Sequence, residues 1–273
     1  MSDTDVSDST AIDVTMKGLS QLVIILGDAK IVKESAKKLK SLGKTVRVGR
    51  GAFLIHSHTS SETSLLHDLP MIAFKKAREI PSVSERGEEA GSRRVYSVIS
   101  YRFRNPTATQ KKRVERLVRR SSSIRLRSGV LLFPVLRSKE RRRLLESDEK
   151  YVLMDSRKLS EELHGLGAEV FRWSRLKIIG HPSEIHNAID RTLSHDFTSF
   201  EMLAKDLRNQ AKAPEAQPKI LKKRYAILSK RYDELKFKWS HASKIWSYDA
   251  TKLLTRGYNM MLSVRRAIDS SNF

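Results

Sequence analysis

The histidines are the residues of this chain whose spacing most resembles a metal site. His56 and His58 stand two positions apart at the end of an apolar run, and His67 is followed by Asp68. Side chains two positions apart on a strand face the same side, so two imidazoles placed in this way can share a metal ion. No second closely spaced pair of ligands accompanies them, and a solvated group of histidines explains the same pattern. We therefore predict no metal site and no cofactor.

Motifs for covalent or phosphate chemistry are absent from the sequence. There is no cysteine, which excludes disulfides, thiolate nucleophiles and cysteine-ligated zinc. There is also no G-x-S-x-G sequence, no P-loop and no G-x-G-x-x-G after an expected strand, and Gly49-Arg50-Gly51 is predicted to be a hairpin turn. We predict no catalytic residue, and an unrecognised hydrolase or nuclease is the third of three functional hypotheses.

Positive charge is the strongest chemical signal in the sequence. The 273 residues include 53 Lys and Arg against 31 Asp and Glu, a net charge of +22. Residues 93–143 hold 17 of the basic residues and only two acidic ones, and a smaller basic excess lies at 205–238. Cations packed this densely repel one another, so a polyanionic partner is a natural explanation, with a generally basic surface as the alternative.

A basic helix and a neighbouring hairpin are the expected binding elements. Residues 108–120 form a helical pattern that opens with a capping-box-like pair, Thr107 and Gln110. Glu115 is the only acidic residue of this helix, so most of its cations lack a helical ion-pair partner. Arginine forks suit phosphates and base edges. The predicted nucleic-acid-binding residues are Arg102, Arg104, Lys112, Arg113, Arg116, Arg119, Arg120, Arg125, Arg127, Arg141, Arg142 and Arg143.

Aromatic residues accompany these cations. Tyr101 and Phe103 belong to the same expected strand as Arg102 and Arg104, and bases stack on such rings in proteins that bind single strands. Core packing is the commoner role of residues of this kind. The aromatic spacing of the common RNA-binding sheet motif is not present in residues 125–133.

The elements that must position these residues indicate an α+β fold, with two ferredoxin-like (βαββαβ) domains followed by a C-terminal helical segment. Apolar strands and amphipathic helices alternate in this order over residues 17–76 and again, with an insertion, in a basic domain at 95–176. The other predicted parts are a disordered acidic tail at 1–16, a linker at 77–94, and a helical region at 181–273 with a linker at 211–218.

The C-terminal helical region suggests an alternative function. Its apolar residues recur at helical spacing, as Leu193, Phe197 and Phe200 do, and a stripe of this kind is far more often core than a cofactor site. In this alternative the chain is a basic scaffold that docks on an acidic protein or a ribonucleoprotein through the helices of 183–268.

A family resemblance strengthens the expectation of DNA binding. The strand Tyr96–Tyr101 is followed by the helix start Asn105-Pro106-Thr107, by a basic helix, and by the strand Gly129–Pro134. This pattern resembles the N-terminal ferredoxin-like domain of the chromate-resistance regulator family (ChrB type), best over residues 95–136. The resemblance implies DNA binding and transcriptional control.

The resemblance also implies which residues act and which chemistry is missing. Residues such as Arg113, Arg116 and Arg127 would contact DNA. Similar CRISPR-associated integration subunits place an aspartate at the end of the first strand, where this chain has Ser100-Tyr101-Arg102. Metal-dependent nuclease chemistry is therefore not supported. The chain also carries an additional N-terminal domain, and no chromate-specific site can be transferred to it.

These observations together predict a cytoplasmic DNA-binding transcriptional regulator, with DNA favoured over RNA as its partner. The longest apolar run, Leu22–Leu26, is far shorter than the roughly 20 residues that span a bilayer, so we expect no membrane association. The chain does not open with a basic and then apolar signal segment. Exposed edges of ferredoxin-like sheets would allow a homodimer.

Overall fold

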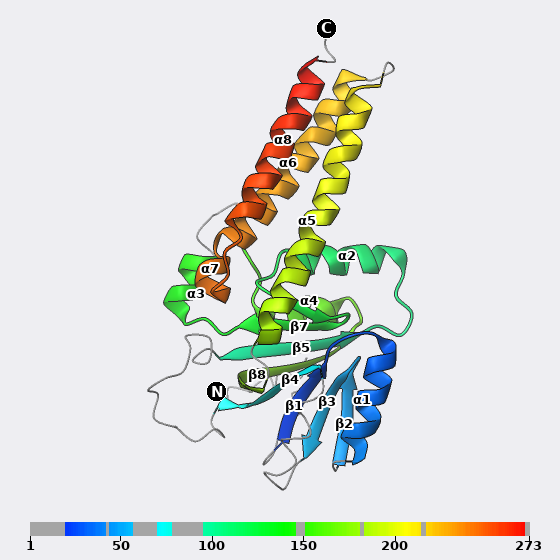
Figure 1. The fold of residues 1–273 in the computed structure, drawn as a ribbon, viewed down its shortest axis with the longest axis vertical. Helices are drawn as coiled ribbons and strands as arrows, with labels where there is room; N and C mark the ends of the chain where they lie inside the picture. The colour runs from blue at the N-terminus through cyan, green and yellow to red at the C-terminus, as the bar shows by residue number, and fades with distance from the viewer. Residues whose placement is uncertain are drawn as a thin grey trace, which may run out of the picture. The chain divides into compact units, whose positions relative to one another are not determined.

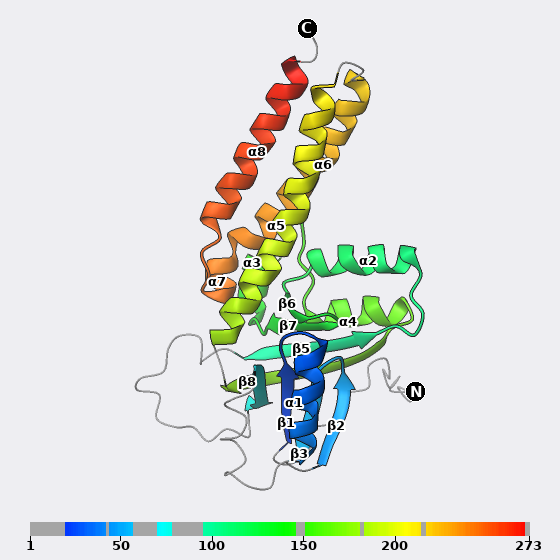
Figure 2. The same ribbon diagram turned by 45° about the vertical axis from the view of Figure 1, so that its right-hand side comes forward.

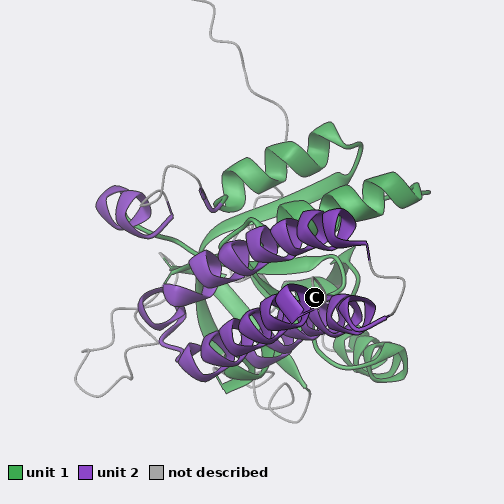
Figure 3. Cartoon of the chain, turned by 90° about the horizontal axis from the view of Figure 1, so that it is seen from above, with its two compact units in different colours: residues 1–137, 154–188 green, residues 138–153, 189–273 purple. Residues whose placement is uncertain are grey.

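The computed structural model describes residues 20–41, 44–56, 70–77, 95–145, 151–180, 183–213 and 217–270. The chain divides into two compact units, Met1–Arg137 with Met154–Ala188 and Ser138–Leu153 with Ile189–Phe273 (Figure 3). The acidic tail expected at 1–16 and nearly all of the linker expected at 77–94 lie outside the described residues. In the part of the chain that is described, no helix has both the length and the hydropathy that a membrane crossing requires.

An antiparallel sheet of eight strands organises the first unit, in the order β2-β3-β1-β4-β8-β5-β7-β6 (Figure 1). The strands are β1 (Ser20–Ile25), β2 (Lys44–Gly49), β3 (Ala52–His56), β4 (Met71–Lys76), β5 (Tyr96–Arg102), β6 (Ile124–Arg127), β7 (Val130–Pro134) and β8 (Glu169–Gly180). Helices pack on this sheet, which confirms the predicted α+β class. Strands from the regions expected at 17–76 and 95–176 share the sheet because β4 pairs with β8.

The first half of the sheet forms around β1, which lies between β3 and β4. Residues Leu22 to Ile25 are fully buried, so both faces of this strand are covered. Val23 and Ile25 share an apolar cluster with Leu39 of helix α1 (Ala29–Ser41), which lies against these strands (Figure 2). Alternate residues of strand β1 and the apolar face of the amphipathic helix α1 therefore pack in one core.

The second half of the sheet is covered by helices α2 (Ala108–Arg119) and α4 (Ser156–Gly165). Val114 and Val118 of α2 pack in one apolar cluster with Leu159 and Leu163 of α4 and with residues of β5, β7 and β8. The predicted helix start is confirmed, because Thr107 and the third helical residue form a reciprocal capping box. The narrow apolar stripe of α2 is thus its core face, and its remaining faces carry the cations.

Two hydrogen bonds join the first half of the sheet to β5 and β6 of the second half, one from β2 and one from β1. The hydroxyl of Ser100 in β5 donates to the carbonyl of Val48 in β2 at 3.2 Å. The guanidinium of Arg127 in β6 donates through Nη1 to the carbonyl of Ile25 in β1 at 2.6 Å. The hairpin is therefore held close to β5 and β6, which are distant from it in the sequence.

This close approach requires glycine on both sides of the hairpin tip. A Cβ added to Gly49 would lie 2.0 Å from Ser100 Oγ, and a Cβ added to Gly51 would lie 1.9 Å from Arg127 Nη1. Gly51 also has a φ of 65°, in the left-handed region that favours glycine. Arg50, between the two glycines, is fixed beside the second half of the sheet.

The second unit is helical. It contains α3 (Ser138–Leu145), α6 (Pro218–Ser240), α7 (Ala242–Trp246), α8 (Thr251–Ser270) and the greater part of α5 (Ser183–Ala211). Phe197 and Phe200 of α5 are buried together with Trp239 of α6 and Met261 of α8. The apolar stripes of the sequence thus form the core of a helical assembly.

An ion pair is buried inside this helical unit. Asp196 of α5 and Lys238 of α6 are 5% and 6% exposed, and Lys238 Nζ lies 3.3 Å from Asp196 Oδ2. The indole Nε1 of Trp239 donates to the same oxygen at 3.3 Å, and His195 Nδ1 lies 3.8 Å from Oδ1. The carboxylate therefore has partners on both of its oxygens.

Candidate nucleic-acid interface

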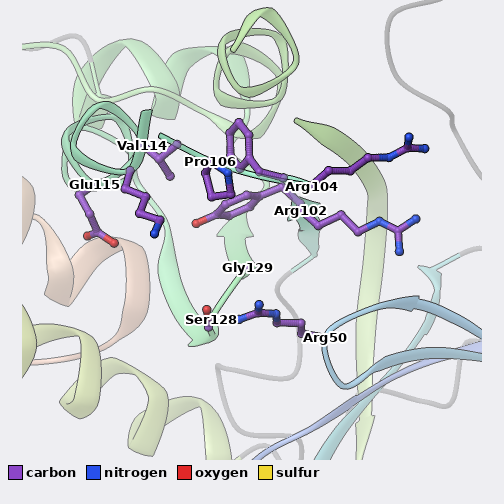
Figure 4. A pocket seen from close by; sticks show the side chains of 11 residues that line it. Arg50, Arg102, Arg104, Pro106, Val114, Glu115, Ser128 and Gly129 are labelled. Carbon is purple, nitrogen blue, oxygen red and sulfur yellow. The ribbon is translucent and has the colours of Figure 1, made fainter. Parts of the chain in front are cut away.

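A hollow of about 450 Å³ opens in the first unit, where β5 ends, α2 begins and the β2–β3 hairpin approaches (Figure 4). We name this hollow the basic groove, because four of its lining residues are basic and one is acidic. Its lining residues are Arg50, Tyr101, Arg102, Phe103, Arg104, Pro106, Lys111, Val114, Glu115, Ser128 and Gly129. Its volume falls within the range of small-ligand sites and can accommodate one nucleotide.

Arg102 and Arg104 are the predicted residues that the structure brings to the basic groove. They stand at and just beyond the end of β5, and Figure 4 shows both side chains extending to the same side. Arg102 donates to both carboxylate oxygens of Glu169, from Nε at 2.5 Å and from Nη2 at 3.0 Å. Arg104 is exposed, and within the described part of the chain no carboxylate lies within ion-pair distance of it.

Helix α2 supplies Lys111 from a position where a positive charge is unfavourable. Its first turn has no acidic residue, and Lys111, Lys112 and Arg113 follow one another near its N-terminus. The N-terminal end of a helix carries a partial positive charge, so cations there lower its stability. Lys111 was not among the predicted residues, because the helix face that meets the groove depends on how Val114 and Val118 pack.

Arg50 is a second contributor that the sequence did not reveal. It lies at the tip of the β2–β3 hairpin, and Figure 4 shows its side chain reaching toward Ser128 at the edge of the groove. The available signal was an arginine held between two glycines at a hairpin turn. Arg50 lies far in sequence from the basic segment 93–143, so no local pattern indicated that it would lie beside β5.

The acidic residue of the groove is already engaged by a cation. Both carboxylate oxygens of Glu115 accept hydrogen bonds from Arg125 of β6, at 3.1 Å from Nη1 and 2.8 Å from Nη2. Arg125, a predicted binding residue, therefore neutralises the groove wall. The positive charge of Arg50, Arg104 and Lys111 is left without a carboxylate partner among the described residues.

Two aromatic side chains contribute apolar surface to the lining of the groove. Tyr101 and Phe103 are half-buried against the core under α2 and meet edge to face, with ring centroids 6.4 Å apart. Burial raises the pKa of Tyr101, while the charge of Arg125 lowers it and that of Glu115 raises it further. The phenol is therefore neutral near pH 7 and can donate or accept a hydrogen bond.

Arg127, another of the predicted binding residues, is held within the fold. Its guanidinium is half-buried and donates to the Ile25 carbonyl, and its Nε is buried without a hydrogen-bond partner in the described structure. Burial lowers the pKa of Arg127, and the positive charges of Arg50 and Arg47 lower it further. Arg127 therefore joins β6 to β1, and its guanidinium lies close to Gly51 at the tip of the hairpin.

The remaining predicted residues lie outside the basic groove. Lys112, Arg113 and Arg116 are exposed on α2, and Arg113 Nη2 lies 4.0 Å from Glu162 Oε2. Arg119 is partly buried, and Arg120 caps the end of the helix. Arg141, Arg142 and Arg143 are exposed on α3, which belongs to the second unit, so the structure does not place them with the groove.

The histidine group considered as a metal site cannot be assessed in the structure, because His58, His67 and Asp68 fall outside the described residues. Within the ranges that are described, no three His, Cys, Asp or Glu side chains gather closely enough to hold a metal ion.

Comparison with known proteins identifies no relative. No family model, no curated protein and no solved structure matches the chain.

Proposed function

We propose that this protein binds nucleic acid, with DNA favoured over RNA, through the basic groove and the exposed face of α2. The observation that carries the proposal is a set of three cations, Arg50, Arg104 and Lys111, around a hollow that two aromatic side chains also line. The only acidic residue in this lining is already paired with an arginine. Phosphates would replace the missing counter-charges and release bound salt ions. The exposed cations Lys112 and Arg116 would extend the contact along α2.

We also propose that the sheet consists of two ferredoxin-like repeats. The first four strands follow the order β2-β3-β1-β4, and the last four follow β6-β7-β5-β8, which is the same order by position in each half. In each half the first strand lies between the third and the fourth, as a βαββαβ repeat requires. The repeats would join through the β4–β8 pair.

Transcriptional regulation is the biological role that we propose for this binding. Its support is the resemblance of residues 95–136 to the chromate-resistance regulators, together with the arginine-rich α2 and the β6–β7 hairpin. Arginine-rich elements of this kind contact phosphates and base edges in DNA-binding proteins.

The test is the binding of fluorescein-labelled duplex DNA, and of duplex RNA of the same sequence, between about 50 and 200 mM salt. We expect the logarithm of the association constant to fall with the logarithm of the salt concentration, with a slope steeper than about −3. Arg104→Glu should weaken binding by about tenfold or more. Lys37→Glu makes the same change in net charge at an exposed position of α1 that does not line the groove, and it should have much less effect. A chain that binds neither the duplexes nor a single strand of the same sequence at the lowest salt would refute the proposal.

Docking on a protein partner is a second candidate, and it rests on a separate observation. Met202 of α5, Ile227 of α6 and Tyr258 of α8 are 67%, 65% and 53% exposed, although they are large apolar residues. Exposed apolar side chains of this size can mark interaction surfaces. A complex that survives nuclease treatment and is lost with Ile227→Glu would favour this function over nucleic-acid binding.

A further inference from the structure

The basic groove has a neighbour on the other side of the end of β5. A second hollow of about 390 Å³ is lined by Arg102, Phe103, Arg104, Asn105, Gln110, Gly167 and Glu169. It shares three consecutive residues, Arg102 to Arg104, with the basic groove. We name these three residues, which line both hollows, the ridge.

The ridge combines the two chemical properties that a nucleotide offers to a protein. Phe103 presents a half-buried ring, and it is flanked in sequence by the guanidinium groups of Arg102 and Arg104. Rings stack on bases, and guanidinium groups bind phosphates. Lys111 and Arg50 add positive charge on the basic-groove side, and Asn105 adds a side-chain amide on the other.

A duplex does not fit this arrangement well. Its bases are stacked and paired in the interior, so a base enters a hollow only after it has left the helix. An exposed face of cations is sufficient to bind a duplex backbone and does not require aromatic side chains. A phosphate-rich partner with accessible bases explains both the cations and the aromatic residues.

A free mononucleotide fits less completely than a strand. One nucleotide would fill one of the two hollows, whereas the hollows share a ridge of three residues with an arginine at each end. Two consecutive nucleotides have one linking phosphate between two bases, which matches this alternation of hollow, ridge and hollow.

We propose that the two hollows bind two consecutive unpaired nucleotides of a single-stranded nucleic acid. The linking phosphate lies against Arg104, and one base stacks on Phe103. This inference rests on the proposed nucleic-acid-binding function and assigns its ligand class.

The experiment compares four probes by fluorescence anisotropy or competition: a labelled 12-nucleotide single strand, its duplex, the same strand without bases, and free thymidine 5′-monophosphate. We expect the single strand to bind about tenfold more tightly than the duplex, and the abasic strand to lose most of this advantage. Phe103→Leu should weaken single-strand binding about tenfold and duplex binding much less, because the bases of a duplex are stacked and paired inside the helix. Circular dichroism and thermal unfolding would show whether that variant folds.

Two polar variants test the same site without altering the core. Lys111→Gln should weaken single-strand binding several-fold more than Lys112→Gln, which removes the same charge from the next residue of α2, outside the lining of the groove. Arg104→Gln should weaken it as well, and because the side chain of Arg104 is exposed, this variant should fold as the unaltered chain does.

The other outcomes of these binding measurements show which of the two proposals is wrong. If no probe binds at low salt, the proposed function itself is wrong. If the duplex and the single strand bind equally and Phe103→Leu changes neither, nucleic-acid binding holds and the single-strand site is wrong. If thymidine monophosphate competes at concentrations close to those of the strand, one hollow binds a free nucleotide and the two-nucleotide site is wrong.

Discussion

In the second unit, Lys238 is buried and its ammonium lies 3.3 Å from Asp196, whereas in the first unit Arg104 and Lys111 line an open hollow and no described carboxylate lies within ion-pair distance of them. A charge removed from water must be paired, or it costs several kcal/mol. An exposed cation near others costs much less to leave unpaired, and it remains available to a ligand. The comparison separates charges that hold the fold from charges that are left for a partner.

The buried pair is strong because each group faces more than one partner. Burial alone would raise the pKa of Asp196, but the charge of Lys238, its hydrogen bond to the carboxylate and the neighbouring His195 imidazole outweigh it and lower the pKa to about 2. The ammonium of Lys238 also lies 5.1 Å from the centroid of the Trp239 ring. The pair therefore fixes how α5 and α6 meet.

The largest expected effect comes from breaking this pair on one side. Asp196→Asn leaves the ammonium of Lys238 buried without its counter-charge, which should lower the free energy of unfolding of the second unit by about 3–5 kcal/mol. Urea unfolding followed by tryptophan fluorescence measures this change, because Trp239 contacts the pair. Asp196→Asn with Lys238→Met removes both charges and should recover most of the loss. A single variant that loses less than about 1 kcal/mol would show that the pair is not structural.

Acid should weaken the second unit over a defined pH range. The pKa of Asp196 is about 2 in the folded chain, against an ordinary value of 3.8, so its contribution is fully present above about pH 5 and is lost as the pH falls through about 2. The expected loss is about 2 kcal/mol. Urea unfolding at a series of pH values measures it. The double variant Asp196→Asn with Lys238→Met should lack this acid-dependent step, and a step that persists there would belong to another carboxylate.

A substitution at Gly51 should destabilise the hairpin that carries Arg50. In Gly51→Ala the new Cβ meets Arg127 Nη1, and the residue must keep a φ of 65°. A left-handed conformation and the displaced guanidinium together should cost the first unit about 2 kcal/mol. Thermal and urea unfolding measure this loss.

Gly165→Ala is the matched control for that variant. Gly165 ends α4, and a Cβ added there meets nothing within 4 Å. We expect it to change the free energy of unfolding by less than about 1 kcal/mol. If both variants behave alike, the close approach of the hairpin to Arg127 contributes nothing to the fold.

The elements were predictable because their patterns are local. The Thr107–Gln110 capping pair and the spacing of Val114 and Val118 are both read within one helix, and the structure has α2 at Ala108–Arg119. The α+β class follows from such local patterns. The β4–β8 pairing was not predictable, because it joins strand edges about a hundred residues apart and no local pattern encodes it.

Which residues line the groove also depends on contacts between segments that are distant in the sequence. Arg102 and Arg104 could be selected from their own strand, but Arg50 joins them only after the hairpin packs on Arg127. Sequence also could not show that Glu115 and Arg125 pair across two elements. Counting charges along the chain therefore found the basic region but not which of its cations remain unpaired.

The smallest expected effect comes from changing Glu115, the acidic residue that lines the basic groove. Its ion pair with Arg125 is partly exposed, with side chains 46% and 26% accessible, so Glu115→Gln should lower the free energy of unfolding by at most about 1 kcal/mol. The same change removes a negative charge from the lining of the groove where we propose that phosphates bind, and the charge of Arg125 is no longer offset. Nucleic-acid binding should therefore become about fivefold tighter, the equivalent of about 1 kcal/mol for one charge in water at close range.

Glu161→Gln is the control, because Glu161 pairs with Arg157 on the exposed surface of α4 and does not line the groove. It changes the net charge equally and should leave binding nearly unchanged. Anisotropy titrations of both variants, with urea unfolding beside them, separate affinity from stability. If Glu115→Gln weakened binding, the Glu115–Arg125 pair would be part of the binding surface, and the groove would need its negative charge. If both variants tightened binding alike, net charge and not the groove would set the affinity.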